Sequence, residues 1–142
     1  MFVEGILAQK GHDAITVKAS STVGELVATL ARHNIGAVLV VDDSGALSGI
    51  ISERDVVREL ARSEEGLMAK PVAAIMTKNP QTCAPTDTLD SVMSKMTRGR
   101  FRHLPVMDNG KLIGVVSIGD VVKRKIEEAE QEAGALREYI AS

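Results

Sequence analysis

The second half of this 142-residue sequence repeats the first half, and two polar residues are kept in both copies. Residues 49–55 contain a glycine, two β-branched apolar residues, a serine, two variable residues and an aspartate, and residues 114–120 keep this order 65 positions later. Upstream, matching residues such as Thr16 and Thr82 lie 66 positions apart. A duplicated apolar pattern indicates only a duplicated core, whereas a duplicated Ser-x-x-Asp after a buried strand suggests a duplicated site.

The length of each repeat limits how the chain can fold. Each has about 60 residues, a size at which a single hydrophobic core is marginal, so we expect the two copies to share one core. The predicted boundaries are residues 1–62 for the first repeat, 63–70 for a linker, 71–126 for the second repeat and 127–142 for a C-terminal helical tail.

Composition argues against several classes of function. A net charge of −2 and only three aromatic residues argue against nucleic-acid binding, which usually needs a basic face or stacking platforms. One cysteine, Cys83, cannot form an intramolecular disulfide and suits a reducing compartment. The longest apolar run, 35–41, is too short to span a membrane, and we read no signal peptide. These features predict a cytoplasmic protein that does not insert into membranes.

Each repeat predicts the same order of elements, β-α-β-β-α with a short helical lead-in. Apolar residues at i, i+3, i+4 and i+7 from Val23 and from Leu89 indicate an amphipathic helix in each copy. Asn109-Gly110 between two apolar runs is a strong hairpin signal. The expected strands are 15–17, 37–41 and 46–51 in the first copy, and 81–83, 103–107 and 111–116 in the second.

The tail carries an apolar stripe with a heptad-like spacing of 4, 3, 4, 3 and 4 residues. Its members are Val122, Ile126, Ala129, Ala133, Leu136 and Ile140. One interpretation is a surface helix that packs on its own domain, and the other is a helix that meets its counterpart in a dimer.

The doubled Ser-x-x-Asp has two interpretations that use the same geometry. Ser52 and Asp55, like Ser117 and Asp120, match a capping box, in which the serine caps a helix and the acid lies at its third position. A helix N-terminus with a hydroxyl group can also bind an anion, and a carboxylate one turn later can accept hydrogen bonds from ribose hydroxyls. Because the motif is kept in both copies, helix capping alone is a less sufficient explanation for it, although a duplication would also copy a residue that only caps a helix.

Taken in order, these pieces resemble a tandem pair of cystathionine-β-synthase (CBS) domains, often called a Bateman module. The resemblance covers the chain from about residue 3 to residue 126. The matching pieces are residues 35–42 and 49–55 in the first copy, 74–77 before the next strand, and 101–106 and 114–120 in the second copy.

The resemblance implies an α+β fold in which two pseudo-symmetric β-α-β-β-α repeats pack through their sheets and leave two clefts between them. Such clefts commonly bind adenosine-containing ligands, namely AMP, ADP, ATP, NAD(H) or S-adenosylmethionine. Two modules of this family often pair through their helices, so the resemblance also implies a homodimer.

Site residues follow from the resemblance position by position. Asp55 and Asp120 would bind ribose hydroxyls, and Ser52 and Ser117 would contact phosphate or ribose. The backbone that would line the base pocket lies around Thr16, Gly36, Ala37, Thr82 and Phe101.

The two copies differ at one site position. The second has Arg102-His103 where the first has Gly36-Ala37. Basic residues here could contact phosphate, since arginine offers a planar set of donors. The alternatives are that the two residues form a solvated surface pair, or that Arg102 bridges to Asp120. Arg54 is a second basic candidate.

We find no nucleophile with an activating base and no metal-ligand cluster in the sequence, so we do not expect an enzyme, a catalytic cofactor or a metal. The favoured hypothesis is a regulatory module that binds an adenosyl ligand and signals its occupancy to another protein. The alternative is a structural or interaction module without physiological nucleotide binding.

Overall fold

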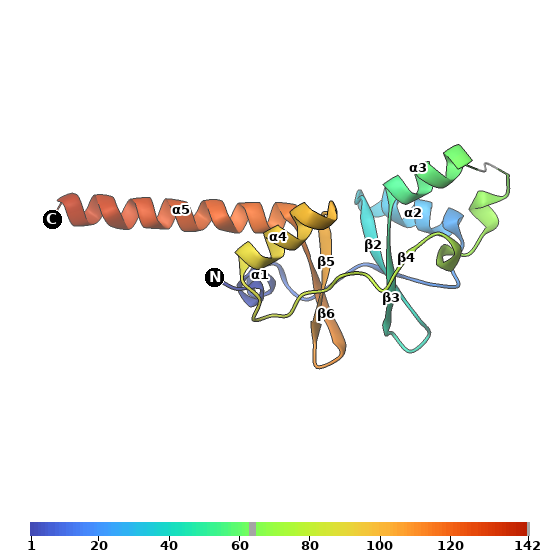
Figure 1. The fold of residues 1–142 in the computed structure, drawn as a ribbon, viewed down its shortest axis with the longest axis horizontal. Coiled ribbons are helices and arrows are strands. Elements are labelled where there is room, and N and C mark those ends of the chain that lie inside the picture. The colour runs from blue at the N-terminus through green and yellow to red at the C-terminus, as the bar shows by residue number, and fades with distance from the viewer. Residues whose placement is uncertain (63–64, 142) are drawn as a thin grey trace. The chain divides into compact units, whose positions relative to one another are not determined.

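The computed structural model describes residues 1–62 and 65–141. The α+β class and the repeated β-α-β-β-α order are confirmed (Figure 1). The elements are α1 (Val3–Lys10), β1 (Thr16–Lys18), α2 (Val23–His33), β2 (Ala37–Val41), β3 (Leu47–Ser52), α3 (Glu53–Arg62), η1 (Leu67–Ala69), η2 (Val72–Ala74), β4 (Thr77–Lys78), α4 (Leu89–Gly99), β5 (His103–Asp108), β6 (Lys111–Ser117) and α5 (Ile118–Ala141).

The chain divides into two compact units. The first-repeat unit consists of Asp13–Gln81 and Asn109–Leu112, and the second-repeat unit consists of Met1–His12, Thr82–Asp108 and Ile113–Ser142. The buried apolar side chains form two clusters, one within each unit. The structure thus has two cores in place of the one expected, and each core includes buried residues from a segment that the sequence assigns to the other repeat.

These exchanged segments are the two helical lead-ins. Helix α1 precedes the first repeat but contributes three buried residues to the core of the second-repeat unit. The 3₁₀ helix η2 precedes the second repeat but buries Val72 in the first-repeat unit. Their backbone contacts match: the N–H of Val3 donates to the carbonyl of Asp87 at 2.9 Å, and that of Val72 donates to Ser21 at 2.7 Å. The internal symmetry of the chain thus extends to individual hydrogen bonds.

The glycine that opens the repeated motif makes room for the exchanged segment in each unit. A Cβ atom added at Gly49 would lie 2.5 Å from the carbonyl oxygen of Thr77, which belongs to β4. A Cβ added at Gly114 would lie 2.9 Å from a methyl group of Leu7 in α1. A larger residue at Gly49 would therefore collide with the backbone of Thr77, which closely follows η2, whereas one at Gly114 would have to displace the end of the Leu7 side chain.

The sheets of the two units differ. The first-repeat unit has a four-stranded sheet in the order β1-β2-β3-β4, with β1 parallel to β2 and the other neighbours antiparallel. Strand β4 was not predicted, because two residues are too few for a periodic pattern. The second-repeat unit contains the β5-β6 hairpin. The strand predicted at residues 81–83 is reduced to one parallel bridge, between Cys83 and Val106.

The predicted hairpin turn is confirmed, and two of the helices start at a threonine cap. Asn109 and Gly110 both have positive φ angles, as a tight hairpin turn requires. The hydroxyl groups of Thr22 and Thr88 accept hydrogen bonds from backbone N–H groups three residues later and cap α2 and α4. Among the described residues, none of the helices is both long and apolar enough to cross a membrane.

The predicted linker and tail are described only in part. Residues 63 and 64 of the linker and Ser142 of the tail lie outside the described residues. The rest of the linker includes η1, whose Leu67 is buried in the core of the first-repeat unit. The tail continues the second helix of the second repeat without a break, so α5 is a single helix of 24 residues.

Candidate functional site

Both Ser-x-x-Asp motifs form capping boxes at helix starts. In the second-repeat unit, the backbone N–H of Ser117 donates to Oδ2 of Asp120 at 2.9 Å, and the N–H of Asp120 donates to Oγ of Ser117 at 3.1 Å. Ser52 and Asp55 make the same two hydrogen bonds, at 2.8 Å and 3.3 Å, before α3. The capping interpretation is thus confirmed, and each carboxylate is held one turn inside a helix that follows a strand.

Both carboxylates remain reachable from solvent. The side chain of Asp55 is 13% exposed, and that of Asp120 is 26% exposed. A carboxylate has about four lone-pair sites, so the capping hydrogen bonds leave acceptor capacity for a ligand. Capping and ligand binding are therefore compatible uses of the same side chain.

The two carboxylates have different cationic partners. Asp55 pairs with Arg58, one turn later on α3, through Oδ1. Asp120 instead pairs with Lys10, whose ammonium group lies 2.7 Å from Oδ2 and also donates to the carbonyl oxygen of Val115 at 2.9 Å. The hydrogen bonds from the Lys10 ammonium group and the Ser117 backbone N–H both go to Oδ2 of Asp120, which leaves Oδ1 as the carboxylate oxygen that neither of them uses. The two sites are related but not equivalent.

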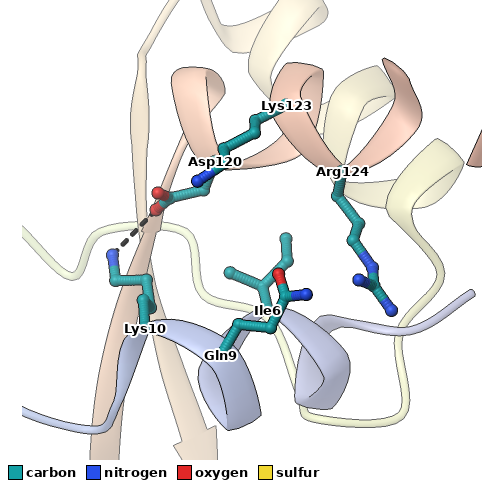
Figure 2. Close-up of a pocket in the computed structure, with 6 residues that line it drawn as sticks. All are labelled: Ile6, Gln9, Lys10, Asp120, Lys123 and Arg124. Atoms are coloured by element: carbon teal, nitrogen blue, oxygen red, sulfur yellow. Dashed lines mark hydrogen bonds and ion pairs between the residues drawn. The ribbon is translucent and has the colours of Figure 1, made fainter. Parts of the chain in front are cut away.

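Lys10 and Asp120 lie in a solvent-open depression between α1 and α5. It has a volume of about 370 Å³, which includes space open to solvent. Figure 2 shows Lys10 on α1 facing Asp120 on α5, with Lys123 and Arg124 on the α5 side. The lining residues are Ile6, Gln9, Lys10, Asp120, Lys123 and Arg124. Three cationic side chains around one carboxylate make this depression attractive to an anionic group.

Sequence reasoning missed the three cations of this depression. Lys10 is 110 residues away from Asp120 in the sequence, and the two meet only because α1 joins the second-repeat unit. The sequence did contain one signal for the role of α1, because the two lead-in segments match each other. That match shows that α1 is part of the repeat, but it does not show which unit α1 packs against. Lys123 could have been noted, since it lies three residues after Asp120 as Arg58 does after Asp55.

Burial and nearby charges shift the pKa values of Asp120 and His103 in the second-repeat unit. Burial alone would raise the pKa of Asp120, but the hydrogen bonds from Lys10 and Ser117 together lower it below its ordinary value of 3.8. Burial is the main reason why the pKa of His103 is lowered from 6.5, and nearby Lys10 and Arg102 lower it further against the opposing effect of Asp120. The lowered pKa favours the neutral form of His103, which can donate one N–H without adding charge.

The lowered pKa of Asp120 predicts how the stability of a Lys10→Met variant depends on pH. A carboxyl whose folded-state pKa is lowered stabilises the fold above its unfolded pKa, and this stabilisation is lost as pH falls through the folded pKa. Methionine keeps the apolar stem of Lys10 but removes the ammonium group, so we expect the variant to be less stable at neutral pH. The difference should disappear in acid, where Asp120 is protonated in both proteins.

Urea unfolding of both proteins over a pH series checks this expectation. A stability difference that stays constant from neutral to acidic pH would show that the Lys10–Asp120 pair is not its source.

Half of the predicted site residues lie in the first-repeat unit. They are Thr16, Gly36, Ala37, Ser52, Arg54 and Asp55. The structure brings Ala37 opposite Ser52 in the β2-β3 ladder, and the carbonyl of Gly36 accepts a hydrogen bond from the N–H of Glu53 at 2.9 Å. Thr16 lies on β1 and is exposed, as is Arg54.

The other half lie in the second-repeat unit, and they are Thr82, Phe101, Arg102, His103, Ser117 and Asp120. The carbonyl of Arg102 accepts a hydrogen bond from the N–H of Ile118 at 2.8 Å, which repeats the Gly36 contact. Arg102 is exposed, whereas His103 is half-buried. The Phe101 ring packs against Gly99 and the core of the second-repeat unit. The carbonyl of Thr82 accepts a hydrogen bond from Lys95.

Cys83 is a core residue. It is 4% exposed and belongs to the apolar cluster of the second-repeat unit. Burial, with a smaller effect of Asp87, raises the pKa of its thiol to about 11. The group is therefore a neutral thiol at physiological pH and is unsuited to act as a nucleophile.

Comparison with known proteins agrees with this architecture. The family model of the CBS domain matches the chain twice, at residues 9–62 and 72–127. The mitochondrial CBS domain-containing protein CBSX3 of Arabidopsis thaliana is 34% identical over 97% of this chain and 71% of its own length. Another Arabidopsis relative, CBSCBSPB1, is much longer, and the match covers 22% of it.

Solved structures that are similar to this chain are also CBS-domain proteins. A CBS-domain containing protein from Agrobacterium tumefaciens is 45% identical, with a TM-score of 0.84 over 87% of this chain and 92% of that protein. A CBS domain pair in complex with 5′-methylthioadenosine and S-adenosyl-L-methionine is 28% identical, with a TM-score of 0.78 over 90% of this chain and 98% of that one. A Pyrobaculum aerophilum CBS domain protein complexed with AMP is 27% identical, with a TM-score of 0.75 over 84% and 89%.

The doubled motif, the matching capping boxes and the exchanged lead-in segments occur in one chain whose two halves both match the CBS-domain model. This chain belongs to the CBS-domain family and contains a tandem pair of CBS domains.

Proposed function

We propose that this chain is a regulatory module that binds an adenine nucleotide or another adenosyl ligand. The candidate ligands are AMP, ADP, ATP, NAD(H) and S-adenosylmethionine. The observation that carries the proposal is the pair of capped, solvent-reachable aspartates at matching positions of the two repeats. Further support comes from CBS-domain relatives that were solved with AMP, 5′-methylthioadenosine or S-adenosylmethionine.

The aspartates are proposed to hold ribose. Ribose presents two neighbouring hydroxyl donors, and a carboxylate can accept one with each oxygen. Asp120 offers Oδ1 directly, whereas a ligand at Asp55 would have to displace or share Arg58. Ser52 and Ser117 sit beside the carboxylates at the helix starts and supply contacts to ribose or phosphate.

Cationic groups are proposed to favour phosphate at the second-repeat unit. Arg102 and neutral His103 provide donors, and the ammonium group of Lys10 is close enough to Asp120 to turn from the carboxylate to a phosphate oxygen. In the first-repeat unit the corresponding positions are Gly36 and Ala37, and Arg54 is the candidate cation there. The backbone around Thr16, Gly36, Ala37, Thr82 and Phe101 is proposed to line the base pockets.

The proposed output is regulatory rather than catalytic. A ligand shifts a protein between two conformations only if it binds them with different affinity, so the module would act by favouring one arrangement. We propose that it works as a homodimer that passes ligand occupancy, and with it the energy state of the cell, to a separate regulated protein. The single buried cysteine agrees with a reducing compartment, and the cytoplasm is the proposed location.

A ligand screen by thermal unfolding tests this proposal. A ligand that binds only the folded state at about 100 times its dissociation constant adds roughly 2.7 kcal/mol of stability. We expect at least one of AMP, ADP, ATP, NADH and S-adenosylmethionine to raise the melting temperature, while GMP, which keeps ribose and phosphate but changes the base, has a smaller effect. If saturating concentrations of all five leave the melting temperature unchanged, the alternative of a structural module without nucleotide binding takes its place.

A further inference from the structure

The apolar stripe of α5 lies on the part of the helix that its own unit leaves exposed. Val121 is the only buried residue among those described in the helix. Beyond it, Ile126, Leu136 and Ile140 are 53%, 58% and 74% exposed. Figure 1 shows the C-terminal part of α5 extending past α1, α4 and the β5-β6 hairpin of the same unit. Packing on its own unit, one of the two interpretations of the stripe, therefore does not account for these residues.

The identities of the stripe residues favour a two-stranded coil. With Ile126 taken as a heptad a position, the a positions are Ile126, Ala133 and Ile140, and the d positions are Val122, Ala129 and Leu136. The β-branched isoleucine at two of the three a positions, with leucine at one d position, follows the pattern that favours parallel dimers over higher oligomers. The seam from residue 122 to residue 140 is about 27 Å long, and its two central layers are alanine, so we expect the pairing to be weak and dependent on concentration.

Charges beside the seam match a parallel second copy. In a parallel coil, each g residue faces the e residue five positions later on the other helix. Lys125 would face Glu130 of the second copy, and Glu132 would face Arg137 of the second copy. Each pair occurs twice, so every charged g position meets the opposite charge.

The antiparallel arrangement that pairs all six stripe residues gives the opposite result. It would place Lys123 against Arg137 and would bring Glu130 and Glu132 each against its own counterpart. Like charges across a seam are destabilising, so the charge pattern selects the parallel arrangement.

We propose that residues 122–140 of two copies of this chain associate as a parallel, in-register coiled coil. This interface is separate from the pairing of modules through their other helices, and it does not require a bound ligand. It would place the C-terminal ends of two chains side by side, where a partner that recognises a paired helix could bind.

Disulfide trapping in the full chain tests the interface at a single layer. Ala133→Cys places a thiol in the seam, where the two copies of the residue face each other only in a parallel, in-register coil. Ala135→Cys is the matched control, because Ala135 is an exposed alanine on the same helix at a c position, away from the seam. The wild-type chain, which carries only the buried Cys83, gives the background.

We expect mild oxidation to crosslink the Ala133→Cys chain about tenfold faster than the Ala135→Cys chain, since effective concentration at a paired seam greatly exceeds that of free collision. Equal rates for the two variants, or rates no higher than the wild-type background, would overturn the proposal. Both positions are exposed, so neither substitution should prevent folding.

A charge swap in the Ala133→Cys background tests orientation. Arg137→Glu should slow crosslinking by about threefold to tenfold, because two attractive pairs become repulsive. Adding Glu132→Arg should restore the rate if the helices are parallel. In the antiparallel arrangement Arg137 would face Lys123, so Arg137→Glu would relieve a repulsion; crosslinking that is not slowed by Arg137→Glu would therefore contradict the proposal. Lys125 is not used for the swap, because it already pairs with Asp90 on α4 at 2.7 Å.

Discussion

Replacing Leu7 with alanine is expected to lower the free energy of unfolding by about 2–5 kcal/mol, the usual cost of emptying a fully buried leucine site. Leu7 is 1% exposed and belongs to the core of the second-repeat unit, although it lies near the start of the chain. Its side chain fills the space over Gly114, where a Cβ atom would not fit. The effect would show that the first lead-in segment is part of the core of the second repeat.

Urea unfolding measures this effect, and the same helix provides the control. Gln9→Ala changes an exposed residue of α1 to a good helix former, so its cost should stay within about 0.5 kcal/mol. Met76 occupies the matching position in the other lead-in segment but is only partly buried, so Met76→Ala should have an intermediate cost. If Leu7→Ala costs no more than Gln9→Ala, α1 does not anchor the second-repeat unit as described.

Most elements of the fold could be predicted because their signals are local. The apolar faces of α2 and α4, the Asn109-Gly110 turn and the two β-strand pairs each depend on a few neighbouring residues. The exchange of α1 and η2 between units could not be predicted, since the periodic pattern of Val3, Ile6 and Leu7 shows that a face is buried but not which core buries it. Strand β4 was missed because a two-residue strand depends on pairing with β3 and carries no pattern of its own.

The candidate site likewise has local features that could be predicted from the sequence and long-range contacts that could not. The positions of Ser117 and Asp120 relative to each other follow from helix capping, which is local, and the sequence predicted them correctly. The partner of Asp120 does not follow, because Lys10 reaches it only through the exchanged helix. A bridge from Arg102 to Asp120, one of the alternatives left open by the sequence, is not among the ion pairs of the described residues, where Asp120 pairs with Lys10.

Replacing Asp120 with alanine is expected to weaken binding of the adenosyl ligand by about tenfold or more, which corresponds to roughly 1.4 kcal/mol. The physical reason is the loss of a charged acceptor for two ribose hydroxyls, since hydrogen bonds to charged groups contribute about 1.5–3 kcal/mol. Asp55→Ala should have the same effect on a ligand that binds in the first-repeat unit. Equilibrium dialysis with labelled ligand gives both affinities.

Two variants separate ribose binding from loss of local structure. Asp90→Ala removes a lysine–aspartate pair of the same 2.7 Å length from the same unit, between α4 and α5. Asp42→Ala removes an aspartate that accepts hydrogen bonds from Ser44 and Ala46 in the first-repeat unit. Neither residue belongs to the candidate site, so both variants should bind ligand as the wild type does. A loss of affinity in Asp90→Ala equal to that in Asp120→Ala would point to a general electrostatic effect.

The central claim is that the repeated aspartates form adenosyl-binding sites as well as helix caps. Calorimetric titration of the wild type beside the Asp55→Ala/Asp120→Ala double variant, with AMP, ADP, ATP, NADH and S-adenosylmethionine, tests it most directly. The account predicts saturable heat for at least one ligand with the wild type and none with a double variant that remains folded. Binding of equal affinity to both proteins would contradict it and would leave the two aspartates as caps alone.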